Sequence, residues 1–321
     1  MKAMIRLFAF CLSVLFAGGA MAGPYPDHPV RILVGFAAGG PTDVIARIVA
    51  QKLSASLGQQ FYVDDKPGAG GNIANAEGAK AAADGYTLTM VSTGFMVNMS
   101  LYARVPYDAV KDFAPITMVA YSPNVVVVHP SVPAKSIKEL IELIKANPGK
   151  YNFAGPGIGS TPHLSGELFK QQFGLDMVHV PFPGAATAIN STIGNHTQLA
   201  FTALPPALGN IKSGKLRALA VLAVNRSSEL PDVPTMREAG YSGQEADTLT
   251  GIVAPAATPK EVVDLLNREI AKAVAEPEVT QQLEKLGFVP VANKPDEFGA
   301  RIKSEIAKWG KVVHDAHLRI E

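Results

Sequence analysis

Glycine- and hydroxyl-rich stretches are where this sequence could do chemistry. The first is AAGGPTD at 37–43, the second is GPGIGSTPH at 155–163, and the third is PGAA at 183–186. Each stands where a helix should start, and free N–H groups and the helix dipole favour an anion there. The first two stretches contain no Lys or Arg, so an anion would be held by amides and hydroxyls. This pattern favours a carboxylate group on a small organic molecule.

Other interpretations of these stretches remain open. Glycines in any single loop could merely make a tight turn. The first loop lacks the Lys-Ser/Thr ending of a nucleotide-binding P-loop, and no dinucleotide fingerprint follows it. A hydrolase using Ser160 and His163 is a remote alternative, because the stretch is not a Gly-x-Ser-x-Gly elbow and a third orienting group is needed. We therefore predict no enzymatic activity, no cofactor and no bound metal.

Single residues near the loops also have a structural interpretation. Asp43 could serve only to cap its helix, and His163 could simply pack in the first turn of its own. Ser92 and Thr93 could be ordinary polar residues at the end of a strand. Asp247 could be an exposed loop acid.

Short apolar strands alternate with helical patterns through the chain, which predicts an α/β fold with mostly parallel strands and helices on both faces. Ser136 and Glu139 form a capping box, and Thr161-Pro162 predicts an N-cap followed by proline. Two Val-rich strands, 125–128 and 216–221, could cross between lobes. The predicted strands are 30–36, 61–63, 86–91, 125–128, 152–154, 177–180, 198–201, 216–221 and 252–254, with long helices at 259–276 and 295–316.

Composition narrows the class of protein. The chain has 321 residues, which suits about two domains, and 47% of them are hydrophobic. It carries 29 Lys+Arg against 28 Asp+Glu, so it lacks the basic footprint of a nucleic-acid-binding protein. A charged fraction of only 18% also argues against a disordered chain.

The N-terminus predicts export. Lys2 and Arg6 precede an apolar run from 7 to 17, and Ala20-Met21-Ala22 offers small residues for cleavage. This is typical of a signal peptide cleaved after Ala22, and the run is short for a membrane-spanning helix. The single cysteine, Cys11, would be removed with the signal peptide. We predict a protein of the periplasm, with a retained membrane anchor as the alternative.

A series of motifs along the whole mature chain resembles the substrate-binding proteins of tripartite tricarboxylate transporters, also called the Bug family. Many such motifs occur in order, which is far more specific than any one of them. They include PVR at 29–31, GGPTD at 39–43, KPGAGGN at 66–72, DGYTL at 84–88, KDFAP at 111–115, NPGK at 147–150, GSTPHL at 159–164, HVPF at 179–182, GKLRALAV at 214–221 and LPDVPT at 230–235.

The resemblance implies a two-lobed type II periplasmic binding protein fold, with two crossover strands and a ligand cleft between the lobes. Residues 1–22 would be the signal peptide, 23–124 plus 245–321 the first lobe and 125–244 the second. It also implies a monomer that captures a small carboxylate and delivers it to an inner-membrane permease. A sensing adaptor that docks on a sensor kinase is the alternative.

The resemblance and the loops together give a set of predicted ligand-binding residues. In the first lobe they are Phe36, Ala37, Gly39, Gly40, Thr42, Asp43, Ser92, Thr93 and Asp247. In the second lobe they are Gly157, Gly159, Ser160, Thr161, His163, Gly184, Ala185 and Thr202.

Two stretches depart from the family pattern. Thr202-Ala203 stands where many relatives have Asp-Asn, and Asp247-Thr248-Leu249 replaces a stretch that often contains tryptophan. Asp247 could accept a hydrogen bond from a hydroxyl or amine at the far end of the ligand, and it would repel a second carboxylate. The identity of the ligand therefore does not follow from the resemblance.

Overall fold

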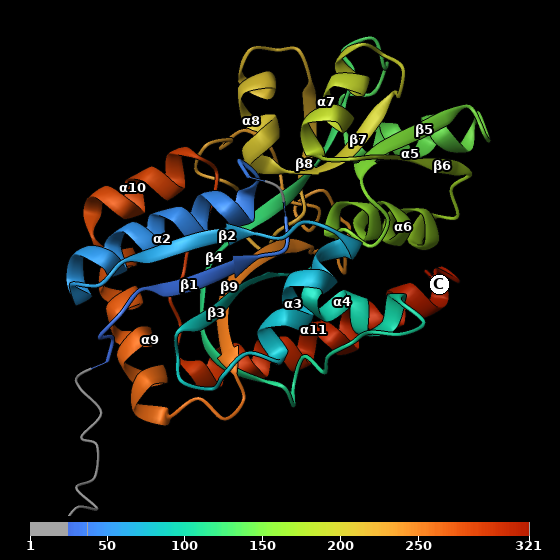
Figure 1. Cartoon of the computed structure of the whole chain (residues 1–321). Helices are drawn as coiled ribbons and strands as arrows, with labels where there is room; N and C mark the ends of the chain where they lie inside the picture. Colours follow the sequence, from blue (N-terminus) through green and yellow to red (C-terminus); the bar gives the residue numbers. More distant parts are fainter. Residues whose placement is uncertain (1–24, 37, 321) are drawn as a thin grey trace, which may run out of the picture.

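The computed structural model describes residues 25–36 and 38–320. The predicted signal peptide, its cleavage after Ala22, and Ala37 lie outside the described residues. Figure 1 shows two groups of elements, which we call the first lobe (lower left, with β1, β3 and α9) and the second lobe (upper right, with β5, β7 and α7). One curled sheet joins them in the order β2-β1-β3-β9-β4-β7-β5-β6. The predicted alternation of strands and helices is confirmed.

Three parallel strands form the centre of the first lobe. They are β1 (Val30–Val34), β2 (Phe61–Asp65) and β3 (Thr87–Ser92), with β1 in the middle. The β-branched run of β1 is buried because helices cover both faces of the sheet. The adjoining helical elements are α2 (Pro41–Leu57), η1 (Ala69–Gly71), α3 (Asn72–Ala79) and α4 (Gly94–Leu101).

The second lobe repeats this arrangement. Parallel strands β5 (Tyr151–Pro156), β6 (Met177–Phe182) and β7 (Leu199–Ala203) lie with β5 in the middle. The Ser136 hydroxyl caps α5 by accepting from the Glu139 N–H, which is one half of the predicted capping box; the Glu139 carboxylate accepts from the Lys135 N–H and not from that of Ser136. The helices are α5 (Ile137–Lys145), α6 (Thr161–Phe173), α7 (Ala185–Ile193) and α8 (Leu204–Lys212), and β8 (Arg217–Val221) follows them.

One long strand, β4, extends through both lobes. Strand β4 (Phe113–Val128) pairs with β9 (Asp247–Pro255) over residues 113–123 and with β7 over residues 124–128. It therefore belongs to both lobes, far beyond the predicted strand at 125–128. These two strands run antiparallel to their neighbours, so the prediction of mostly parallel sheets holds only within each lobe.

The prediction that the 216–221 strand crosses between lobes is wrong. Strand β8 pairs with residues 125–128 of β4 and, through Val221, with Thr235, all inside the second lobe. The return crossing comes later, where the Leu222 N–H bonds to the Asn124 carbonyl and the Ala246 N–H bonds to the Leu222 carbonyl. An apolar run shows that a strand is buried, but it does not show which neighbour the strand pairs with.

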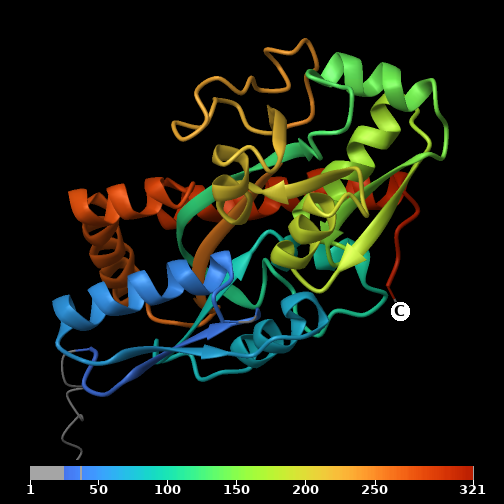
Figure 2. The same ribbon diagram turned by 90° about the horizontal axis from the view of Figure 1, so that it is seen from above.

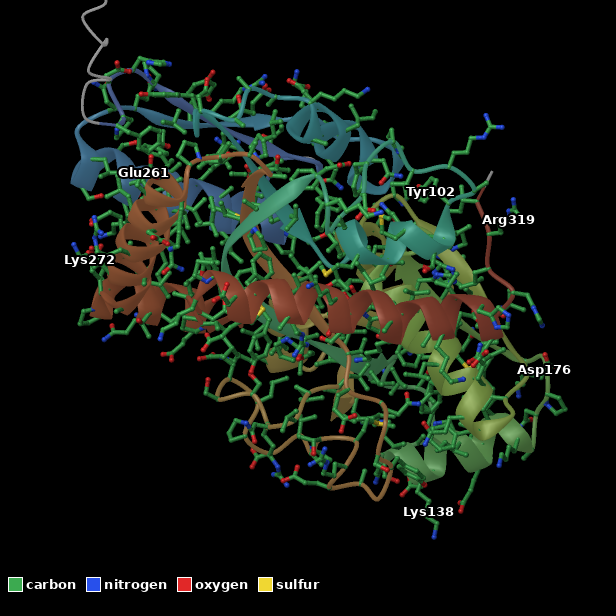
Figure 3. All side chains as sticks on the ribbon, turned by 90° about the horizontal axis from the view of Figure 1, so that it is seen from below. Tyr102, Lys138, Asp176, Glu261, Lys272 and Arg319 are labelled. Atoms are coloured by element: carbon green, nitrogen blue, oxygen red, sulfur yellow. The ribbon has the colours of Figure 1, made fainter. Side chains whose placement is uncertain are left out.

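The C-terminal helices brace the fold. Figure 3 shows α11 running along the underside of both lobes, and Figure 2 shows it behind the sheet from above. Phe298 and Ile302 of α11 pack with the first lobe, whereas Trp309 and Val313 pack with Leu164 of α6. These elements are α9 (Lys260–Ala275), α10 (Pro277–Lys285), β10 (Val289–Pro290) and α11 (Pro295–Asp315). None of the helices within the described ranges is long and apolar enough to span a membrane.

Strand β9 tolerates no side chain at Gly251. A Cβ there would lie 2.3 Å from Phe298 Cζ and 2.9 Å from the Thr117 carbonyl oxygen. We expect Gly251→Ala to destabilise the protein by about 1–3 kcal/mol, as overpacking usually does, and to lower Tm by several degrees. The exposed helical Gly209, where a Cβ meets nothing within 4 Å, provides the matched control Gly209→Ala. Equal melting temperatures for the two variants in a thermal scan would contradict this packing.

Candidate ligand-binding site

The first loop joins β1 to α2 and is held from within. Gly39 adopts a left-handed conformation (φ +80°), and its N–H donates to Asp43 Oδ2 at 2.7 Å. Asp43 is only 2% exposed, so its carboxylate is turned toward its own loop. The N–H of Thr42, in the first turn of α2, has no acceptor among the described residues.

Two further glycine contacts fix the course of the first loop. A Cβ on Gly35 would lie 2.6 Å from the Gly71 Cα, so the KPGAGGN loop passes directly beside the end of β1. Gly71 in turn lies beside the Phe36 ring. The Phe36 side chain therefore packs on the 66–72 loop, while Gly39 and Gly40 stand beyond it at the start of α2.

The second loop, between β5 and α6, has the same construction. Gly159 is left-handed (φ +82°), and its N–H donates to His163 Nδ1 at 3.1 Å. The predicted cap is wrong by one residue: Ser160 is the N-cap, because its hydroxyl accepts from the His163 N–H, and Thr161 is the first helical residue. Because Thr161 is the first residue of α6, its N–H has no intrahelical acceptor, and it finds none elsewhere in the described part of the chain.

His163 is a neutral buried imidazole. It is 3% exposed, and its ring lies 4.1 Å from that of His179. Burial, with a smaller contribution from His179, lowers the pKa of His163 to about 3, and burial lowers the pKa of His179 to about 4. Because Nδ1 accepts from Gly159, the proton of His163 resides on Nε2, which lies 3.8 Å from Glu167 Oε1.

The third loop is more open. The Gly184 N–H and carbonyl both bond to the Thr187 hydroxyl, which closes the first turn of α7. A Cβ would meet nothing within 4 Å at Gly184, nor at Gly157 in the second loop. Ala185 is the first residue of α7. These positions have room beside them for a ligand.

The polar residues at strand ends are used inside the protein. Thr93 is fully buried, accepts from the Leu249 N–H at 3.0 Å and donates to the Asp247 carbonyl at 3.3 Å. The Ser92 hydroxyl accepts from the Gly94 N–H at 3.3 Å. Thr202 is also fully buried and donates only a long bond to the Ala203 carbonyl. A purely structural role would make the same contacts, so ligand binding by these residues stays a prediction.

Asp247 is half-buried at the start of β9, not an exposed loop acid. Its Oδ1 is buried and has no hydrogen-bond partner within the described residues. Burial raises the pKa of this carboxyl to about 7, although Arg301 and Lys308 of α11 act to lower it. Glu305 and Glu245 raise it further.

A polar cluster that the sequence analysis missed lies where β4 passes between the lobes. Asn124 donates to Ser165 Oγ of α6 at 3.4 Å and accepts from the Thr248 hydroxyl of β9 at 3.2 Å. The Ser122 hydroxyl is buried without a partner among the described residues. The signal available in the sequence for this cluster was that Ser122 and Asn124 interrupt an otherwise apolar run. These side chains join both crossover strands to the first turns of α6.

The structure brings the first two loops toward a shared region. Figure 1 shows α2 and α6 beginning toward the middle of the molecule, one from each lobe. A Cβ on Gly159 would lie 2.0 Å from Leu101 Cδ2, so the second loop presses against α4 of the first lobe. The Thr202-Ala203 end of β7 meets Asn124 at the same junction.

One surface hollow lies away from the starts of α2 and α6. It measures about 630 Å³ and is lined by Phe182, Pro183, Thr187 and neighbouring residues of α7, beside the third loop only. A second hollow of about 620 Å³ lies between the starts of α9 and α11. Neither hollow includes the starts of α2 and α6, whose N–H groups are the expected donors for an anion.

The charged side chains near the two loops form ion pairs with one another. Arg47 Nε approaches Asp43 Oδ1 to 2.8 Å, without the alignment of a hydrogen bond, and Arg47 Nη2 bonds to Asp65 at 2.8 Å. Lys170 bonds to Glu167 at 2.9 Å. The described residues contain no group of three His, Cys, Asp or Glu side chains that could hold a metal ion. The arrangement can therefore bind an anion through amides and helix dipoles.

Comparison with known proteins identifies the family. The model of the tripartite tricarboxylate transporter family receptor matches residues 45–318. The chain belongs to this family. The predicted resemblance is thereby confirmed, and so is the two-lobed periplasmic binding protein fold. Members of this receptor family bind solutes and are not enzymes, as predicted.

Solved structures of receptors agree closely with this one. The periplasmic binding protein BugD is 35% identical, with 92% of this chain and 100% of that chain covered and a TM-score of 0.82. An R. palustris protein solved with adipate is 34% identical, with the same coverage and a TM-score of 0.85. MatC from Rhodopseudomonas palustris, with bound malate, is 30% identical over 90% of this chain and 100% of that chain (TM-score 0.81). The predicted location in the periplasm agrees with this receptor family.

Asp247 gives the receptor a stability that depends on pH. Because the folded carboxyl has a pKa near 7 rather than 3.8, the fold holds its proton more tightly than the unfolded chain does. Stability should therefore fall as pH rises from about 4 to about 7. We expect the Asp247→Asn variant not to lose stability in this way as the pH rises. The Tm of the variant should therefore exceed that of the wild type by several degrees at pH 8 but by little at pH 4.

Thermal scans between pH 4 and pH 8 test this, with exposed Asp232→Asn as the control. A difference between Asp247→Asn and wild type that stays constant across this range would contradict the buried carboxyl.

Proposed function

We propose that this receptor captures a small organic carboxylate between the starts of α2 and α6 and delivers it to the permease of a tripartite tricarboxylate transporter. The observation that carries the proposal is a pair of helix starts whose N–H groups at Thr42 and Thr161 find no acceptor within residues 25–36 and 38–320, with no basic side chain in either loop. The relatives solved with adipate and malate, both carboxylates, support it.

Each loop would contribute a defined set of donors. The Thr42 and Thr161 amides would hold the carboxylate oxygens, and the helix dipoles would add to the attraction. Open space beside Gly39, Gly157 and Gly184 would let backbone approach the ligand closely. Phe36, Ala37, Gly40, Ser160, Ala185 and Asp247 would complete the walls. The polar cluster at Ser122 and Asn124 would lie under the ligand at the junction of the lobes.

Binding would act by closing the lobes. A ligand shifts a conformational equilibrium only by its difference in affinity for the two states. A carboxylate that touches both helix starts meets this condition, because only the closed state offers both. The bending points would be Asn124 in β4 and the Leu222–Ala246 crossing, where few backbone bonds join the lobes.

Export and partners complete the proposal. We propose that residues 1–22 direct export and are cleaved after Ala22, and that the mature chain of residues 23–321 works as a monomer. Residues 23–124 and 245–321 would form the first lobe and 125–244 the second. The permease would recognise the closed receptor.

The variant Thr161→Pro tests the site most cleanly. Ser160 already has φ −66° and ψ 151°, which suit a residue before proline, so the helix should form while one N–H and one hydroxyl are lost. At about 100 times its dissociation constant, a carboxylate should add about 2.7 kcal/mol and raise the wild-type Tm by several degrees. We expect Thr161→Pro to abolish this shift without changing the ligand-free Tm appreciably.

The control Thr161→Val keeps the N–H and should still respond to the ligand. Adipate, malate and a panel of mono- and tricarboxylates serve as probes, with sugars and amino acids as comparison. Unchanged affinity in Thr161→Pro would remove α6 from the site. A wild-type protein that responds to none of the carboxylates would contradict the proposed function.

The delivery step has its own test. Tagged receptor, loaded with the carboxylate that gives the largest thermal shift, should retain transporter membrane subunits from solubilised inner membrane. Ligand-dependent recovery of those subunits supports delivery to a permease. Recovery of a sensor kinase in their place would show that the receptor serves sensing and would overturn the transport step.

A further inference from the structure

The two loops contain the same structural device. In each, a left-handed glycine donates its N–H to the side chain four residues later, at the third position of the following helix. The pairs are Gly39 with Asp43 and Gly159 with His163, and both acceptor side chains are at least 97% buried. The two lobes thus build their helix starts alike, although the acceptors differ chemically.

This hydrogen bond restricts the conformation of the glycine before a ligand binds. A glycine can adopt many backbone conformations, and fixing it costs conformational entropy. A buried acceptor that holds the glycine N–H selects one conformation in advance. The loop gives up one amide as a ligand donor, and the remaining amides are held in place for an anion.

The two acceptors differ in their electrostatic surroundings: acidic groups lie around Asp43, whereas the groups around His163 are neutral or paired. Asp43 is an acid that lies near a second acid, Asp65, and Arg47 pairs with both of them. Burial, and to a smaller extent the nearby Asp43, raise the pKa of Asp65, whereas Arg47 acts to lower it. At α6, His163 and His179 are neutral, and Glu167 is paired with Lys170.

We propose that Asp43 and His163 are positioning residues that preorganise the two loops, and that Asp43 also sets specificity by disfavouring negative charge at the start of α2. The proposal rests on the proposed function and goes beyond it. The carboxylate charge of the ligand is carried mainly by the start of α6. At the start of α2, the ligand presents either an uncharged group or an oxygen of the same carboxylate that binds at α6. A monocarboxylate is therefore favoured over a dianion whose second carboxylate reaches α2.

Paired substitutions separate positioning from charge. His163→Asn keeps an acceptor oxygen near the place of Nδ1, whereas His163→Ala has none. We expect His163→Ala to weaken carboxylate binding about tenfold, the equivalent of one lost hydrogen bond, and His163→Asn to stay within about threefold of wild type. Equal losses in both variants would overturn the positioning role of His163.

Asp43→Asn removes the charge but keeps the acceptor for Gly39. We expect it to strengthen the binding of adipate at least about threefold relative to a monocarboxylate of similar length, whereas Asp43→Ala weakens both. Titration calorimetry at fixed ionic strength measures these ratios. Exposed Asp296→Asn, in the first turn of α11, controls for the change in net charge. An unchanged ratio in Asp43→Asn would overturn the specificity role.

A readout without ligand keeps this inference separate from the proposed function. Amide hydrogen exchange at Gly159 should be slow in the wild type and in His163→Asn, and about tenfold faster in His163→Ala. Gly39 should respond in the same way to Asp43→Asn and Asp43→Ala. Exchange that is equally fast in wild type and in the alanine variants would overturn the positioning role even if carboxylates bind. Failure of all carboxylates to bind would contradict the proposed function alone.

Discussion

The hydrogen bonds that hold Gly39 and Gly159 are the contacts on which the proposed site depends. A site without lysine or arginine must bind an anion through backbone dipoles, and dipoles are effective only when they are fixed before the ligand arrives. Buried acceptors at Asp43 and His163 supply that fixation from within each loop. The proline at the start of each helix strengthens this fixation, because proline restricts the backbone. Proline also has no N–H of its own that would compete with the neighbouring N–H groups for the anion.

The rest of the fold sets where these two loops meet. Strand β4 continues through both lobes, so the parallel strands on either side deliver their loops to one junction. Helix α11 packs on the first lobe through Phe298 and on α6 through Trp309, so it spans the junction from behind. In the proposed closure, relative motion would be concentrated at Asn124 and the Leu222–Ala246 crossing. A long bracing helix and a few bending residues are what a receptor needs to close on a ligand without unfolding.

The sequence predicted the loops well because their signals are local. Glycine, proline and hydroxyl residues at a strand-to-helix turn determine the conformation within a few residues, and ordered motifs identified the family. Other features depend on distant partners. The charges of Arg301 and Lys308 that act on Asp247 come from α11, more than fifty residues away, and the pairing of β8 depends on β4. Structural roles for Asp43 and His163 at the starts of their helices were among the predictions. The N–H group that each side chain accepts from was not predicted because it depends on loop conformation, although the shared spacing from Gly39 and Gly159 was visible in the sequence.

The central claim is that backbone amides of both lobes hold the carboxylate. The most direct test is the set of amide ¹H–¹⁵N resonances of the mature protein, recorded while a bound carboxylate such as malate or adipate is added. The account predicts that the Thr42 and Thr161 amide protons move downfield together, because both would donate to the same anion. Saturable carboxylate binding that leaves these two resonances unmoved would contradict it.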